Sequence, residues 1–178
     1  MPISGAIPSF PLNLRYNTFK PSYRLEGVDA IQTLEIQTKR IFCRFCIAGS
    51  RKKYEFLIDT GAPLSVIPKM IWTKWPAGSI ERFNLLDENE ELQTVKHGVA
   101  GKSARASLGR IKLSLRYEPE LSFSKIIETE PFEIIAKFVE EESSFNRAVL
   151  GFGGNAMERW QGLDIDFRKP GNWTARLV

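Results

Sequence analysis

Apolar and polar residues alternate along most of the chain beyond residue 34, which is the pattern of β-strands with one buried face. The first such segment places four apolar side chains on one face, those of Ile41, Cys43, Phe45 and Ile47. A turn signal at residues 49–51 and a second apolar run at 54–58 follow directly. The pattern therefore predicts a β-hairpin over residues 34–58.

Apolar runs, and alternation again at residues 163–167, predict further short strands separated by turn-forming residues. They cover residues 65–67, 94–99, 104–115, 132–139, 147–150, 163–167 and 173–178. The strands at 94–99 and 104–115 flank Gly98 and Gly101, so we expect a second hairpin there.

Helical signals are sparse by comparison. Residues 69–75 form either a short helix or a connection. Asn155 is a suitable N-cap for a helix over residues 155–160, which is the one plausible helix in this region. The predicted fold class is therefore all-β, with short strands and one short helix.

The N-terminal segment differs from the rest. Residues 1–25 contain four prolines and little periodicity, so we expect an extended arm or a poorly ordered leader, or else an irregular segment packed on the domain. The full length of 178 residues suits a single domain. We therefore expect an N-terminal arm over residues 1–30 and one domain over residues 31–178.

Composition and charge bear on whether the protein binds nucleic acid or a membrane. The formal net charge is +4 with both signs mixed along the chain, which does not demand a nucleic-acid partner. The N-terminus lacks the pattern of a secretory signal, and no apolar stretch approaches the roughly 18 residues of a membrane span. We therefore expect a cytoplasmic protein with neither a nucleic-acid nor a membrane partner.

Cys43 and Cys46 form a C-x-x-C pair, but His97 is the only histidine and no second cysteine pair accompanies them. An offset of three residues puts the two thiols on opposite faces of a strand. We expect core or surface thiols and no metal, with a redox or metal role as the alternative.

The informative stretch is residues 56–68, where Asp59-Thr60-Gly61 follows an apolar strand and another strand comes after it. An acid in this position lies at the edge of a dry core. Thr60 offers a hydroxyl for hydrogen bonds, and Gly61 allows a tight turn that brings its N–H close to the carboxylate. Such a loop holds one aspartate rigidly; a plain β-turn is the simpler alternative.

This stretch resembles the active-site loop of the retropepsin-like aspartic proteases, with Asp59 as catalytic residue and Thr60, Gly61 and Ala62 completing the loop. Ala148-Val149-Leu150-Gly151 is similar to the family's apolar pair and glycine that lie beneath the loop. The hairpin tip resembles the family's flap, which comprises Gly98, Val99, Ala100 and Gly101. The resemblance implies an all-β acid-protease fold, in a cellular or bacterial rather than retroviral member.

Asp59 is the only aspartate followed by Thr-Gly. Peptide hydrolysis of this type needs two carboxylates that share a proton, because two like charges so close together cannot both ionise. A twofold axis places the same residue of two subunits face to face. We therefore expect a homodimeric endopeptidase without a cofactor, with its active site at the dimer interface.

The resemblance also implies that the two Thr60 residues lock the paired loops together, and that a peptide or protein substrate lies in pockets formed partly by Leu64, Val99, Val149 and Leu150. Ala62 has no hydroxyl to stabilise the ionised acid, so we expect activity at mildly acidic pH.

Two alternatives stay open. The chain could be a peptide-binding or scaffolding module without turnover, or a protease that is inactive until a partner binds or the N-terminal arm is removed.

Overall fold

The computed structural model describes residues 9–96, 102–119, 125–142, 146–168 and 173–178, and in these residues the fold is all-β, as predicted. The strands are β1 (Phe10–Phe19), β2 (Ser22–Tyr23), β3 (Gln32–Thr33), β4 (Ile36–Ile47), β5 (Lys53–Ile58), β6 (Ser65–Ile67), β7 (Ile80–Arg82), β8 (Thr94–Lys96), β9 (Ser103–Tyr117), β10 (Ile127–Glu128), β11 (Phe132–Val139), β12 (Ala148–Leu150), β13 (Leu163–Asp166) and β14 (Thr174–Leu177). The helices described are α1 (Lys69–Trp72) and α2 (Glu90–Gln93), each a single turn.

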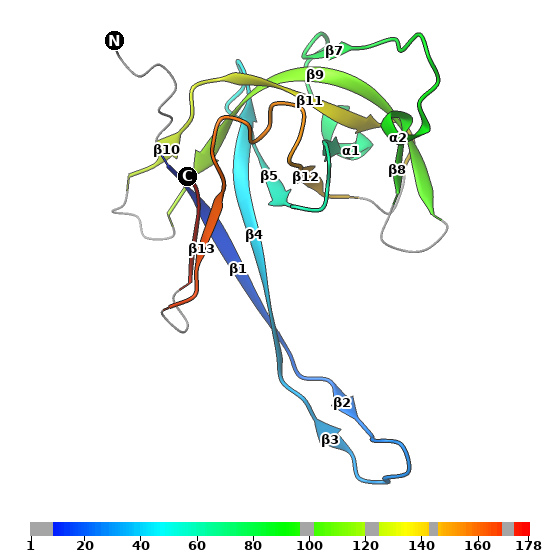
Figure 1. Cartoon of the computed structure of the whole chain (residues 1–178), viewed down its shortest axis with the longest axis vertical. Helices are drawn as coiled ribbons and strands as arrows, with labels where there is room; N and C mark the ends of the chain where they lie inside the picture. The colour runs from blue at the N-terminus through cyan, green and yellow to red at the C-terminus, as the bar shows by residue number, and fades with distance from the viewer. Residues whose placement is uncertain (1–8, 97–101, 120–124, 143–145, 169–172) are drawn as a thin grey trace.

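The main sheet closes on itself. Its strand order is β10-β9-β11-β6-β12-β5-β4-β1-β14-β13, and β9 pairs a second time with β4. Strands β9, β11, β6, β12, β5 and β4 therefore form a closed ring, around which the other strands are arranged (Figure 1). Closure removes the free edges of these six strands, which would otherwise be open to pairing with another chain.

The main core fills this ring with large apolar side chains. Phe45, Phe56, Phe138, Leu113 and Ile134 are fully buried, and the rings of Phe45 and Phe56 stack at 3.8 Å between centroids. Burying each such side chain stabilises the fold by roughly 1.5–3 kcal/mol. A second apolar cluster of Val66, Val95, Ala104, Ala106, Val139 and Val149 lies apart from it.

Both predicted hairpins are confirmed. Strands β4 and β5 pair antiparallel with Phe42 opposite Leu57, and β8 pairs antiparallel with the start of β9, with Val95 opposite Ala104. The segment at residues 69–75, where a helix and a connection were both open, contains helix α1.

The helix predicted over residues 155–160 is wrong. This segment consists of turns, and Gly154 and Asn155 both have positive φ angles, of 69° and 65°. Two successive left-handed residues cannot begin a right-handed helix. Contacts with β11 hold them there: Ile135 N–H donates to Gly154 O (2.8 Å), and the Asn155 side-chain amide donates to Glu133 O (2.7 Å).

The N-terminal segment is more regular than expected. Residues 10–19 form strand β1, which pairs with β14 through Phe10–Leu12 and with β4 from Asn13 onward. Phe10, Leu12, Leu14 and Tyr16 do alternate with polar residues, but Pro11 interrupts the strand signal.

A long hairpin projects from the body of the molecule (Figure 1). We call residues 16–39 the arm; they comprise the outer parts of β1 and β4 and the small β2–β3 hairpin at the tip. At the base of the arm, Phe42 pairs with Asn13 on one edge of β4 and with Leu57 on the other. Strand β5 ends at Ile58, so the arm leaves the body where β5 ends. None of the helices in the described residues is long and apolar enough for a membrane crossing.

Candidate functional site

The Asp59 loop, residues 59–64, connects β5 to β6 across the end of a third strand. Strand β12 lies between the other two, parallel to β5 and antiparallel to β6. The loop must therefore cross the C-terminal end of β12, where Asp59 N–H donates to Leu150 O (3.2 Å). Three strands thus fix the start, the crossing and the end of a six-residue loop.

Inside the loop, Asp59 is held by backbone groups that follow it. Gly61 N–H donates to Asp59 Oδ1 (2.9 Å), so the predicted approach of this amide to the carboxylate is confirmed. Ala62 N–H donates to Asp59 O (3.2 Å) and closes the turn. A Cβ on Gly61 would lie 3.3 Å from Asp59 Oδ1, which is a tight contact.

The environment of the carboxylate differs from the prediction. Asp59, Thr60 and Gly61 are exposed in the single chain, not placed at a dry edge of the core. The reason is that β5 ends before Asp59, so the acid projects beyond the ring instead of pointing into it. The same exposure leaves the Asp59 and Thr60 side chains accessible to another molecule.

Gly151 lies directly beneath the loop. A Cβ at this position would be 2.5 Å from Leu64 C and 2.7 Å from Ala62 O, distances that real side chains do not reach. Its N–H donates to the Oγ of the fully buried Ser65 (3.0 Å), and the next residue, Phe152, donates its N–H to Ala62 O (2.9 Å). Only a residue without a side chain allows β12 and the loop to approach this closely.

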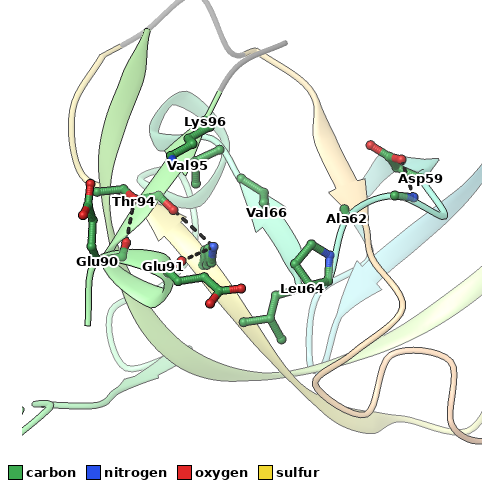
Figure 2. A pocket seen from close by; sticks show the side chains of 12 residues that line it. Asp59, Ala62, Leu64, Val66, Glu90, Glu91, Thr94, Val95 and Lys96 are labelled. Carbon is green, nitrogen blue, oxygen red and sulfur yellow. Dashed lines mark hydrogen bonds between the residues drawn. The ribbon is translucent and has the colours of Figure 1, made fainter. Parts of the chain in front are cut away.

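A groove of about 570 Å³ begins at Asp59. Its lining residues are Asp59, Gly61, Ala62, Pro63, Leu64, Val66, Glu90, Glu91, Thr94, Val95, Lys96 and Lys137. Asp59 lies at one end and α2, with Glu90 and Glu91, at the other; Leu64 and Val66 lie between them (Figure 2). The middle of the groove is thus apolar, one end carries the Asp59 carboxylate, and the other end carries both acids and the lysines Lys96 and Lys137.

Lys137 holds the far wall of this groove in place. Its side chain is only 8% exposed, and its ammonium group donates hydrogen bonds to the backbone oxygens of Glu91 and Thr94. Burial lowers the pKa of Lys137, while the nearby Glu91 carboxylate raises it to a smaller extent. This lysine connects β11 to α2 and β8.

The predicted pocket residues fall into three groups. Leu64 lines the groove. Val149 is instead buried in the second apolar cluster, and Leu150 is fully buried in the main core, so their assignment as pocket residues is wrong. Strand β12 is a member of the ring between β5 and β6, and its side chains are buried on both faces, Ala148 and Leu150 in the main core and Val149 in the second cluster. Val99 lies outside the described residues.

The predicted flap has its base but not its tip in the described part of the chain. Strands β8 and β9 form the hairpin, and Val95 and Lys96 of β8 line the groove. Gly98, Val99, Ala100 and Gly101 lie outside the described residues.

Both cysteines are buried and unpaired. Cys43 belongs to the main core, and burial raises the pKa of both thiols. A buried thiol with a raised pKa is a poor nucleophile and a poor metal ligand. Among the described residues, His, Cys, Asp and Glu side chains do not gather into a group able to hold a metal ion.

Several groove residues were missed from the sequence: Glu90, Glu91, Lys96 and Lys137. A signal existed for α2, because Asn89 is an N-cap whose side chain accepts from Leu92 N–H (3.3 Å), with two acids in the first turn. Lys137 was visible as the one charged residue inside the apolar run 134–139.

Comparisons with known proteins give a structural likeness and no match of sequence. No protein-family model matches the chain, and no curated protein sequence matches it. The chain is similar to the crystal structure of a retropepsin-like aspartic protease from Rickettsia conorii, with 14% sequence identity, 93% of each chain covered and a TM-score of 0.40.

Proposed function

We propose that the protein is an aspartic endopeptidase that acts as a homodimer, with Asp59 of each chain forming the catalytic pair. One observation carries the proposal: Asp59 stands exposed at the end of a groove, in a loop braced by β12 and Gly151, with Gly61 N–H bonded to its carboxylate. The Asp-Thr-Gly-Ala sequence of this loop is the motif by which the chain resembles the retropepsin-like proteases.

A second chain is needed for chemical reasons. The loop supplies one aspartate followed by Thr-Gly, and the reaction uses two carboxyl groups that hold one proton between them. The exposure of Asp59 and Thr60 supports a loop-to-loop contact across a twofold axis. The pair would then titrate as a unit instead of as two separate acids.

The proposed reaction conserves its protons at each step. The ionised Asp59 takes a proton from a water molecule, whose oxygen attacks the peptide carbonyl carbon. The protonated Asp59 of the other chain gives its proton to the carbonyl oxygen, which produces a tetrahedral diol. When the C–N bond breaks, one hydroxyl proton returns to a carboxylate and the leaving nitrogen accepts a proton from the other carboxyl group.

The groove suggests how a substrate lies. An extended peptide fits between the Asp59 loop and β8, because the groove runs from Asp59 past Leu64 and Val66 to Val95. Its apolar middle favours an apolar side chain next to the bond that is cut.

The decisive experiment is Asp59→Asn with a mixed peptide pool as substrate. We expect cleavage to fall at least about a thousandfold, because the amide cannot exchange the proton. Asp164→Asn is the matched control, since Asp164 is an exposed aspartate on β13 outside the groove, and it should leave cleavage unchanged. Pepstatin-type mimics of the diol should block the wild-type reaction.

A mixing experiment tests the shared site. Equal amounts of wild type and Asp59→Asn, allowed to exchange subunits, should show roughly a quarter of the wild-type activity at the same total concentration, because mixed dimers have one acid. Activity of about one half would mean that single chains act alone and would refute the dimeric site.

The pH profile is a separate test. Cleavage should be fastest at mildly acidic pH, whereas binding of peptides without cleavage over roughly pH 3–7 would favour a peptide-binding module.

A further inference from the structure

We propose that the arm, residues 16–39, is a docking surface for a second copy of this chain and that it clasps the partner beside the paired Asp59 loops. This inference rests on the proposed homodimer but adds a surface that the chemistry of the Asp59 pair does not require. It concerns assembly, so it is tested on the oligomeric state and not on cleavage.

The arm carries an unusual share of the exposed apolar side chains. Of the 14 large hydrophobic residues exposed in the described parts of the chain, seven lie within these 24 residues. They are Tyr16 (37% exposed), Phe19 (53%), Leu25 (54%), Val28 (43%), Ile31 (66%), Leu34 (46%) and Ile36 (41%). Scattered exposed residues need no explanation, but a concentration on one projecting element marks an interaction site.

Three of these residues gather on one part of the ribbon. Phe19 and Ile36 are directly opposite each other in the β1–β4 ladder, so their side chains share a face. Leu34 is two residues before Ile36, and its N–H donates to Pro21 O (2.9 Å), which continues the ladder past the end of β1. The neighbouring pair, Thr18 and Gln37, points to the opposite face and is polar.

The arm has no core of its own to cover this face. Beyond Asn13 and Phe42, β1 and β4 pair with each other alone among the described strands. A two-stranded ribbon is marginally stable in water unless a third layer covers it. The seven exposed side chains of the arm, of which Tyr16 lies on the face opposite Phe19 and Ile36, together present on the order of 500 Å² of apolar surface, and an apolar surface of this size often has a binding function.

Charge and position identify the occupant as a second copy. The arm contains three basic residues, Lys20, Arg24 and Lys39, and three acids, Glu26, Asp29 and Glu35, so it is neutral with both signs present. A neutral, mixed surface suits pairing with its own kind and does not suit an anionic membrane or nucleic acid. The arm also leaves the body next to the end of β5, so it projects from the same end of the sheet as the Asp59 loop.

The test replaces Phe19 and Ile36 by charged residues while preserving the pairing of β1 with β4. In the double variant Phe19→Glu and Ile36→Lys, the introduced charges are opposite in sign and face each other, which preserves cross-strand attraction. The matched control makes the same change on the other face, with Thr18→Glu and Gln37→Lys. Sedimentation equilibrium should show a dimer dissociation constant at least ten times higher for the first variant and within about twofold of wild type for the control.

The outcomes separate this inference from the proposed function. If the Phe19/Ile36 variant dimerises as tightly as wild type, or if the wild-type chain is monomeric at about 100 μM, the docking surface is refuted. If the wild type dimerises through the arm but shows no cleavage that depends on Asp59, the docking surface stands and the protease proposal fails. Loss of binding to neutral phosphatidylcholine vesicles by the Phe19/Ile36 variant, with no effect on dimerisation, would assign the arm to a membrane and overturn the proposal.

Discussion

The Asp59 loop and the arm are neighbours that are built in opposite ways. Each continues from one of two paired strands, the loop from the end of β5 and the arm from β4. The loop contacts the end of β12 and the residues after it at both its start and its second half, and a single added carbon at Gly151 has no space. The arm is a two-stranded ribbon with seven exposed apolar side chains, and near its base the Lys39 ammonium lies 3.3 Å from the centre of the Trp173 ring.

The Asp59 loop and the arm differ in where their packing partners lie. The loop is held by its own chain, through Gly61, Ser65 and Leu150, and is positioned before any partner or substrate arrives. Such positioning is what catalysis requires, because small displacements of an acid cost large factors in rate. Most side chains of the arm are exposed, as expected of a segment that packs against another molecule.

The strongest way to break this contrast is Gly151→Ala. The new methyl group would lie 2.5 Å from Leu64 C and 2.6 Å from Leu64 O, so the loop must shift. We expect a loss of about 3 kcal/mol in the free energy of unfolding, measured by urea denaturation. Gly162→Ala is the control, because a Cβ there meets nothing within 4 Å, and it should change stability by less than about 1 kcal/mol. Equal behaviour of the two variants would mean that the loop is not braced.

Removal of the Lys137 ammonium from the far wall of the groove should have an effect on stability between those of the loop and the arm variants. In Lys137→Met, the backbone oxygens of Glu91 and Thr94 lose their charged donor, so we expect a loss of roughly 1–2 kcal/mol near neutral pH. Glu91→Gln keeps the backbone acceptor and serves as the control, with a change under about 0.5 kcal/mol.

The contribution of Lys137 to folding stability should depend on pH. Because burial lowers the pKa of Lys137 below its usual 10.5, the unfolded chain holds more protons than the folded chain in the interval just below that value. The contribution of Lys137 to stability therefore rises with pH across this interval. The difference in melting temperature between wild type and Lys137→Met should grow from about pH 8 toward pH 10.5 and then level off. A difference that shrinks over this range would contradict the burial of the charged group.

The smallest effect is expected from shortening the arm. Replacing residues 20–35 by Asn-Gly joins Phe19 to Ile36 through a two-residue hairpin turn. Under conditions where the chain is monomeric, the free energy of unfolding should change by no more than about 0.5 kcal/mol, because the arm packs on no core. A loss above about 2 kcal/mol would show that the arm supports its own body and would remove the contrast with the loop.

Much of the sheet could be predicted from local pattern. Alternation marked the inner part of β4, and apolar runs marked β5 and β11, of which β11 is buried on both faces toward its end. Strand β11 was predicted over the same residues that the structure shows, 132–139. The Asp59 loop could also be recognised, because its acid, turn residue and flanking strands are adjacent in sequence.

What failed depended on contacts between distant residues. Gly154 and Asn155 adopt left-handed conformations in which Gly154 bonds to Ile135 and Asn155 bonds to Glu133, and nothing near residue 155 indicates this. The role of Lys137 depends on α2, more than forty residues away. Leu150 was assigned to a pocket because alternation does not reveal which side of a crossed strand meets the core. The β1–β4 ribbon was missed because the prolines of residues 1–25 obscured strand β1, so nothing indicated that Phe19 pairs with Ile36.

The closed ring has a consequence for how such a chain can diverge. Its two long members, β4 and β9, continue beyond the ring, one into the arm and the other into the hairpin over the groove. Residues added in pairs at either tip lengthen that projection without changing strand register, so the ring tolerates them. The crossing beneath Asp59 has no such freedom, and one inserted residue there would displace the acid. Evolution can therefore change the lengths of the arm and of the β8–β9 hairpin while the position of Asp59 is kept.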